Sequence, residues 1–275
     1  MALPAQRWET FTLERMGEDE VLTLNRPASL NALNQQMCSE LLEYKGELEQ
    51  RELVESRAQL LPRVIVIRAN GRAFSAGLDL LDNSLDLDKT EGVAFFNFQR
   101  RISQVIVNLR RLKQPVISLV QGACCGFGFA LALASDVRLA TKDARFNVAM
   151  AKIGLTGCDI GISYHLPRIV GPSLAAELMF TGDFLGAERA MQAGMLSSVH
   201  DSIEEMHKRG LELAQRMCLT MSPSALFMTK EGLKHAINAS SLEQAVAMED
   251  RQQLLQLRSS DFATYSRKAF AKAKL

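Results

Sequence analysis

Three glycines follow an apolar run in the middle of the chain, at Gly122, Gly126 and Gly128. The preceding run, Val116–Val120, is β-branched and predicts a buried strand, and an apolar helix over 127–134 is predicted to follow. Glycine lets the backbone approach a ligand closely, and the first turn of a helix carries unpaired N–H groups and partial positive charge. The pattern predicts a site for an anion, or for a carbonyl oxygen that becomes one.

A second loop has the same character, because Ser75-Ala76-Gly77-Leu78-Asp79 follows a predicted strand over 63–68. If the two strands are parallel neighbours, both loops leave the same edge of the sheet, where α/β proteins bind ligands. Two backbone N–H groups in one cleft would form an oxyanion hole suited to a thioester enolate, and losing one such donor costs about 3 kcal/mol. Singly, each loop could be an ordinary strand-to-helix turn, but the pair favours a functional site.

Dinucleotide binding is a rival interpretation of the glycine-rich loop. Gly126-Phe127-Gly128 lies between a strand and a helix, as part of the G-x-G-x-x-G pattern requires. The third glycine position is Leu131, whose side chain would obstruct close packing of helix and strand. The motif also lies in the middle of the chain and not in a first βαβ unit, so we reject this interpretation.

The composition is that of a globular protein, with 47% hydrophobic and 23% charged residues and a formal net charge of +1. Such a charge provides no field for nucleic acid or an anionic membrane, and neither partner is expected. Five cysteines do not suggest a disulfide framework. With no signal peptide and no apolar run of membrane-spanning length expected, we predict a cytoplasmic protein in a reducing compartment.

Alternating segments over 9–14 and 20–25 predict a β-hairpin, and strands alternate with helices through the first two thirds of the chain. This order predicts a layered α/β core with parallel pairing. Beyond residue 171 nearly every segment has helical periodicity. The expected helices are 37–53, 93–112, 127–134, 173–181, 186–193, 202–221, 223–236, 242–257 and 262–272.

Several segments closely resemble the enoyl-CoA hydratase/isomerase (crotonase) superfamily, in a collinear match from about residue 7 to residue 261. They are Asn25-Arg26-Pro27, Asn31-Ala32-Leu33, Ala73 to Asp79, Lys113 to Val116, Gln121 to Gly128, Ser135-Asp136, Ile153-Gly154-Leu155, Leu166 to Gly171, Phe180 to Asp183 and Ala193-Gly194. The resemblance implies a spiral core of ββα units that binds CoA, over 1–200. It also implies a helical C-terminal region over 201–275 that builds homotrimers, often paired into homohexamers.

The resemblance also implies positions for the site. The oxyanion-hole amides would be those of Leu78 and Phe127, and Phe127 replaces the middle residue of the family's usual Gly-Gly-Gly. A backbone donor survives this side-chain change. The CoA channel would be lined by Leu30, Ala76, Gly77, Asp79 and Gly126.

The departures from the family pattern concern the acid–base groups. The two glutamates that hold water in hydratases are replaced here by Ala130 and Met150, so ordinary hydration should be slow or absent. Asp159 resembles in position the proton-transferring aspartate of dienoyl-CoA isomerases and the nucleophilic aspartate of aryl-CoA dehalogenases. The dehalogenases' histidine and tryptophan fall on Ser103 and Met150. Apolar surroundings should raise the pKa of Asp159, which could instead cap a helix beginning near Ile160.

The sequence therefore predicts an acyl-CoA-processing enzyme whose first candidate reaction is double-bond isomerisation, with Asp159 moving the proton. Hydrolysis or substitution with Asp159 as nucleophile stays open, and so does non-catalytic acyl-CoA binding. No metal is expected, because His200, His207 and His235 share no ligand spacing. No cofactor is expected beyond the CoA that the substrate carries.

Overall fold

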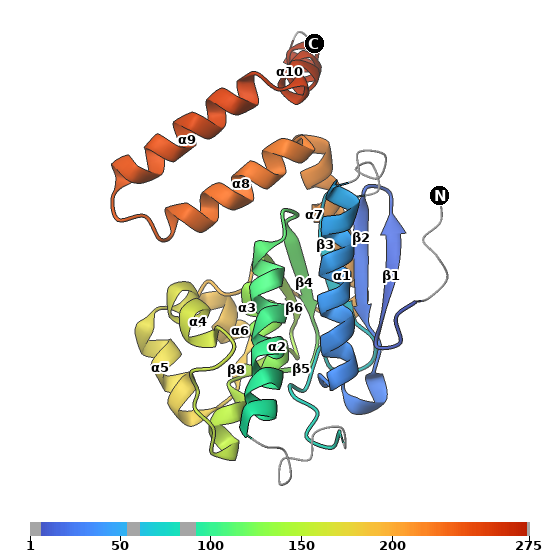
Figure 1. The fold of residues 1–275 in the computed structure, drawn as a ribbon, viewed down its shortest axis with the longest axis vertical. Helices are drawn as coiled ribbons and strands as arrows, with labels where there is room; N and C mark the ends of the chain where they lie inside the picture. Colours follow the sequence, from blue (N-terminus) through green and yellow to red (C-terminus); the bar gives the residue numbers. More distant parts are fainter. Residues whose placement is uncertain (1–6, 54–60, 83–91, 274–275) are drawn as a thin grey trace.

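The computed structural model describes residues 7–53, 61–82 and 92–273. Its main sheet has six strands in the order β1-β2-β3-β4-β6-β9 (Figure 1). The strands β1 and β2 form the predicted antiparallel hairpin, and the other neighbours pair in parallel. The bounds are β1 (Phe11–Met16), β2 (Asp19–Leu24), β3 (Ile65–Ala69), β4 (Val116–Val120), β6 (Val137–Thr141) and β9 (Ser198–His200). The prediction of a parallel α/β core is confirmed.

A second, three-stranded sheet was not predicted from the sequence. It consists of β5 (Ala123–Cys125), β7 (Arg145–Asn147) and β8 (Leu185–Gly186), in the order β5-β7-β8. Strands of two or three residues are too short to show an alternation of polar and apolar side chains. Because β5 lies within the glycine-rich loop, this small sheet holds that loop in place.

Helices cover both faces of the main sheet, so its strands are buried on each side and alternate between two hydrophobic cores. One core joins Leu22, Ile65 and Ile67 to helices α1 (Gln35–Leu53), α2 (Gly92–Arg111) and α3 (Phe127–Ala134). The other joins Val21 and Val66 to helix α7 (Ile203–Thr220). The remaining elements of this part are η1 (Pro27–Ser29), η3 (Ala149–Ile153), α4 (Ile162–Val170), α5 (Pro172–Thr181) and α6 (Ala187–Gln192).

The C-terminal helices α8 (Pro223–Ala236), α9 (Leu242–Leu257) and α10 (Ser260–Ala273) extend beyond this core, as the orange and red ribbons of Figure 1 show. No residue of α9 is buried in the single chain. The helical C-terminal region is therefore present as predicted, although its first helix, α7, packs on the main sheet. Within the described ranges, no helix combines the length and apolar character needed to cross a membrane.

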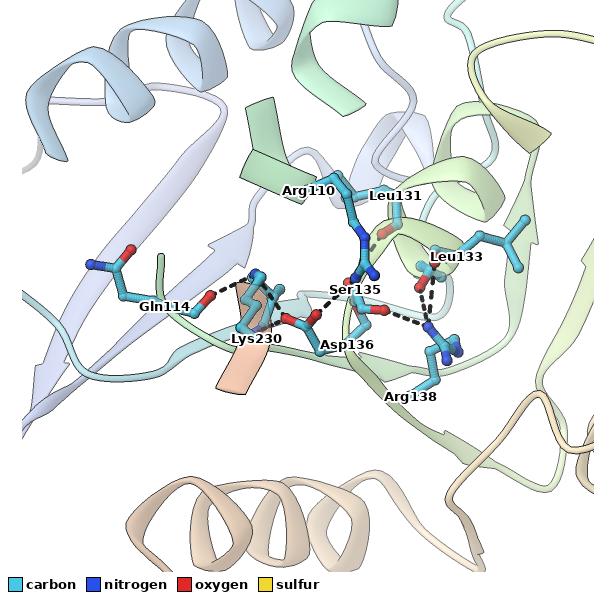
Figure 2. A network of polar contacts seen from close by, with 11 residues as sticks. Arg110, Gln114, Leu131, Leu133, Ser135, Asp136, Arg138 and Lys230 are labelled. Carbon is cyan, nitrogen blue, oxygen red and sulfur yellow. Dashed lines mark hydrogen bonds and ion pairs between the residues drawn. The ribbon is translucent and has the colours of Figure 1, made fainter. Parts of the chain in front are cut away.

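A buried polar network attaches α8 to the core (Figure 2). The Lys230 side chain is 3% exposed, and its Nζ donates to the Gln114 carbonyl oxygen at 2.7 Å and pairs with Asp136 Oδ2 at 2.8 Å. Arg110 pairs with the other carboxylate oxygen of Asp136 at 2.8 Å. Burial lowers the pKa of Lys230 to about 8, although the carboxylate favours its charged form. This network fixes the direction in which the C-terminal helices leave the core.

Candidate functional site

The two loops singled out in the sequence lie side by side. They follow β3 and β4, which are parallel neighbours, so both leave the same edge of the sheet. The Ser75 N–H donates to the Ala123 carbonyl oxygen at 3.1 Å, and the Cys125 N–H donates to the Ser75 carbonyl oxygen at 2.9 Å. These two bonds form a parallel β-bridge between Ser75 and Cys124. The expectation that the loops meet at one edge is confirmed.

The loops also lie close together at Gly77, Gly126 and Gly128. A methyl group on Gly77, which has φ of +104°, would lie 3.2 Å from the Cys125 carbonyl oxygen and 3.8 Å from the Gly126 Cα. A methyl group on Gly128 would lie 2.6 Å from the Ser75 Cβ. Glycine is therefore needed here for close packing of backbone on backbone. As a result, the residues directly before Leu78 and Phe127 are in contact across the two loops.

The backbone amides of Leu78 and Phe127 point away from the hydrogen bonds that join the neighbouring residues of the two loops. The Leu33 N–H donates to the Gly77 carbonyl oxygen at 2.7 Å, and the Asp79 N–H donates to the Leu33 carbonyl oxygen at 2.9 Å. In such a ladder the intervening Leu78 N–H points to the opposite side. Phe127 is the first residue of α3, where N–H groups have no partner within the helix. Within the described part of the chain, neither amide donates a hydrogen bond to the protein.

The segment that the resemblance assigns to CoA lies against the first loop. The Ala76 N–H donates to the Leu30 carbonyl oxygen at 2.9 Å, and the Arg26 guanidinium pairs with Asp79 at 2.9 Å. Leu30 and Asn31 have φ of +50° and +53°, and the buried Asn31 side chain accepts the Arg26 N–H at 2.8 Å. The structure therefore brings Leu30, Ala76 and Asp79 together beside Leu78. Sequence reasoning did not identify Arg26 or Asn31 as their supports.

Asp159 lies on the loop between η3 and α4. Its Oδ1 accepts the Ile160 N–H at 2.8 Å, and Ile160 has φ of +38°. Burial raises the pKa of Asp159, while hydrogen bonds from Ile160 N–H and Gln99 oppose that increase. The helix α4 begins at Ile162 with Gly161 as its N-cap and has no side-chain cap. The alternative that Asp159 caps a helix beginning near Ile160 is therefore wrong.

Gln99 is the partner of Asp159 that sequence reasoning missed. Its side-chain amide on α2 donates a hydrogen bond to Asp159 Oδ1, across sixty positions of sequence. Gln99 is half-buried between Phe98 and Ile102, which are 8% and 4% exposed. The helical periodicity of the sequence puts Gln99 at the edge of the buried face of this helix. That position does not show that its side chain bonds to Asp159.

The other candidates lack groups suited to acid–base or nucleophilic chemistry. Ala130 and Met150 are 1% and 7% exposed and belong to the main hydrophobic core. Burial raises the pKa of Cys124 well above its usual value and that of Cys125 to about 11, so both remain thiols near neutral pH. Burial and nearby guanidinium groups lower the pKa of His165 to about 4. In the described ranges, no cluster of three potential ligand side chains could hold a metal.

The chain is similar to known proteins of one family in both sequence and fold. A family model described as enoyl-CoA hydratase/isomerase matches residues 20–274. A probable enoyl-CoA hydratase of Mycobacterium leprae (strain TN) is 34% identical over 89% of this chain and 81% of its own length. The 1,2-epoxyphenylacetyl-CoA isomerase of Escherichia coli (strain K12) is 31% identical over 88% of this chain and 87% of its own length. The crystal structure of an enoyl-CoA hydratase of Mycobacterium smegmatis superposes with a TM-score of 0.83, at 27% identity over 96% and 97% of the chains.

Proposed function

This chain belongs to the enoyl-CoA hydratase/isomerase family, and from that premise we propose that it moves a double bond within an acyl-CoA thioester. The observation that carries the proposal is the close approach of Gly77 and Gly126, which directly precede Leu78 and Phe127, whose amides donate no hydrogen bond within the described part of the chain. Such donors stabilise negative charge on a thioester oxygen. The relative in Escherichia coli is by name an isomerase of an epoxyacyl-CoA, which supports isomerisation of an acyl-CoA as the general class of reaction.

The proposed reaction is a 1,3-proton shift. The Asp159 carboxylate takes a proton from Cα of a 3-enoyl-CoA, and the electron pair moves onto the thioester oxygen as a dienolate. The amides of Leu78 and Phe127 hold that oxygen. Asp159, now protonated, returns the proton to Cγ, which leaves a 2-enoyl-CoA and the original carboxylate. The raised pKa of Asp159 makes this carboxylate a stronger base than an exposed one.

Hydration is the less favoured reaction. In the family pattern two glutamates hold and activate water, and their positions are taken here by Ala130 and Met150. Both side chains are buried, and neither can exchange a proton. Asp159 is thus the single acid–base group that sequence comparison offers for the reaction.

A substrate panel tests the proposal. We expect the protein to convert trans-3-hexenoyl-CoA to trans-2-hexenoyl-CoA, measured by chromatography of the acyl-CoA products. Hydration of trans-2-hexenoyl-CoA should be at least about a hundredfold slower, because no second carboxylate activates water. Three outcomes would contradict the proposal: faster hydration than isomerisation, release of free CoA by hydrolysis, or tight binding with no turnover.

We also propose that the chain assembles as a homotrimer or a homohexamer through its C-terminal helices. The support is the exposure of large apolar side chains on α8 and its C-cap residue, on α9 and on α10, which a single chain leaves in water. They are Leu233, Ile237, Leu242, Val246, Leu254, Leu255, Leu257 and Phe262. Light scattering should give a mass of three or six chains of 30.4 kDa, and a monomer at micromolar concentration would refute this arrangement.

A further inference from the structure

The Asp159 carboxylate is held asymmetrically. Both hydrogen bonds that the protein gives it go to Oδ1, one from the Ile160 N–H at 2.8 Å and one from the Gln99 side-chain amide. Among the residues that the structure describes, Oδ2 receives no hydrogen bond. An oxygen with two donors is a poor proton acceptor, while an oxygen without donors keeps its lone pairs for another group.

The backbone at Ile160 is arranged to give this contact. Its φ of +38° lies in the left-handed region, which a β-branched residue rarely adopts. Such strain persists only where the surroundings determine it, and it is found at functional sites. The Ile160 side chain is 8% exposed in the main core, and the Ile162 N–H donates to the Asp159 carbonyl oxygen at 2.8 Å. The strained turn therefore directs the Ile160 N–H onto the carboxylate.

Gln99 supplies the second donor from a different element. The helix α2 packs against α1 and α3, and the neighbours of Gln99 at Phe98 and Ile102 are buried in the main core. The Gln99 amide is therefore presented by a fixed helix and not by a mobile loop. Two donors from independent elements set both the position and the rotation of the Asp159 carboxylate.

We propose that Gln99 is a positioning residue for proton transfer: together with the Ile160 N–H it engages Asp159 Oδ1 and leaves Oδ2 to move the proton. This inference rests on the proposed function, since it assigns the atom through which Asp159 works. In the shift described above, Oδ2 takes the proton from Cα and delivers it to Cγ. Gln99 itself neither gains nor loses a proton.

Few titratable groups surround this turn. The His165 ring of α4 lies against Gly161, and its lowered pKa keeps it neutral near pH 7. The exposed Cys158 is adjacent in sequence, and α2 contributes the apolar Ile106 beside Gly161. Burial raises the pKa of Asp159, and the Ile160 and Gln99 donors lower it. Removing the Gln99 donor should therefore raise that pKa further.

The test compares Gln99→Met with Gln104→Met, a substitution of an exposed glutamine on the same helix whose side chain donates to Asn108 Oδ1. With trans-3-hexenoyl-CoA as the probe, Gln99→Met should lower kcat about tenfold with little change in KM, because a misplaced base still binds substrate. A base must be deprotonated to act, so the acid limb of the kcat profile should move to higher pH. Gln104→Met should match the unmodified protein in kcat, in KM and in the pH profile of kcat.

A measurement without substrate keeps the inference falsifiable. The carboxyl pKa of Asp159, followed by carbon NMR, should rise in Gln99→Met and stay unchanged in Gln104→Met. If Gln99→Met leaves the rate, the pH profile and this pKa unchanged, the positioning role of Gln99 is overturned. The proposed function would still stand in that case if Asp159→Asn is inactive. If Asp159→Asn retains full turnover, the proposed function fails and this inference fails with it.

Discussion

Replacing Asp159 by asparagine is expected to lower kcat for isomerisation of trans-3-hexenoyl-CoA about a thousandfold, the middle of the range for losing a general acid–base group. Asparagine keeps the shape of the side chain and can still accept the Ile160 N–H, so folding and substrate binding should be retained. It cannot take up a proton at Cα. The measurement is steady-state kinetics of the variant beside the unmodified protein, with KM as the check on binding.

Asp201→Asn is the matched control for this substitution. Asp201 lies just before α7, and its exposed carboxylate pairs with Lys142. It should retain full activity. Equal rates for the two variants would show that Asp159 does not transfer the proton. If Asp159 instead attacks the thioester as a nucleophile, one turnover in water enriched in heavy oxygen should label its carboxylate, whereas isomerisation leaves it unlabelled.

Gly122→Ala is expected to destabilise the fold by about 4 kcal/mol, the sum of a left-handed backbone penalty and a steric clash. Gly122 has φ of +56°, and a methyl group there would lie 2.0 Å from the Arg72 carbonyl oxygen and 3.4 Å from the Ala73 Cα. Both contacts are with backbone, which cannot move aside as a side chain can. Urea unfolding should show the loss as a lower midpoint with an unchanged slope.

Gly154→Ala separates the two causes of this loss. Gly154 has φ of +82°, but a methyl group there would have no atom within 4 Å. Its substitution should therefore cost only the backbone penalty, about 1 kcal/mol. If Gly122→Ala is no more destabilising than Gly154→Ala, the close approach of Gly122 to the backbone of Arg72 and Ala73 is not a constraint on this fold. Residual folded Gly122→Ala protein should also lose activity, since the clash pushes the two loops apart.

Backbone contacts between the two loops are what connect this fold to its proposed chemistry. A side-chain oxyanion hole could be removed by one substitution, but the amides of Leu78 and Phe127 belong to the main chain. Their position depends on glycines at 77 and 128, where an added side-chain atom would press on or strike the opposite loop, and on Gly126, whose φ of +48° favours glycine. For this reason Phe127 can replace a glycine of the family pattern without loss of the donor. The acid–base groups, in contrast, are side chains, and a single substitution can remove one. The departures from the family pattern concern these groups.

Much of the framework could be predicted from the sequence, because it is encoded locally. Alternating apolar residues identified the β1–β2 hairpin, and β-branched runs identified β3 and β4 as buried strands. Parallel pairing then placed the loops at 75–79 and 122–128 on one edge, which the contact between Gly77 and Gly126 bears out. The inference from the resemblance that Ala130 and Met150 occupy the positions of two family glutamates also needed no structure, since neither side chain can exchange a proton.

Only the tertiary structure decided which groups donate hydrogen bonds to the Asp159 carboxylate. A loop aspartate two or three residues before a helix has the local pattern of an N-cap, yet Gly161 takes that place and the Asp159 side chain bonds the Ile160 N–H. Its second donor, Gln99, comes from a helix sixty residues earlier, and no periodicity in either segment specifies that meeting. Burial patterns in a sequence state which face of a helix turns inward. The rotation and approach of two elements that share no backbone bonds are set by the packing of the whole core.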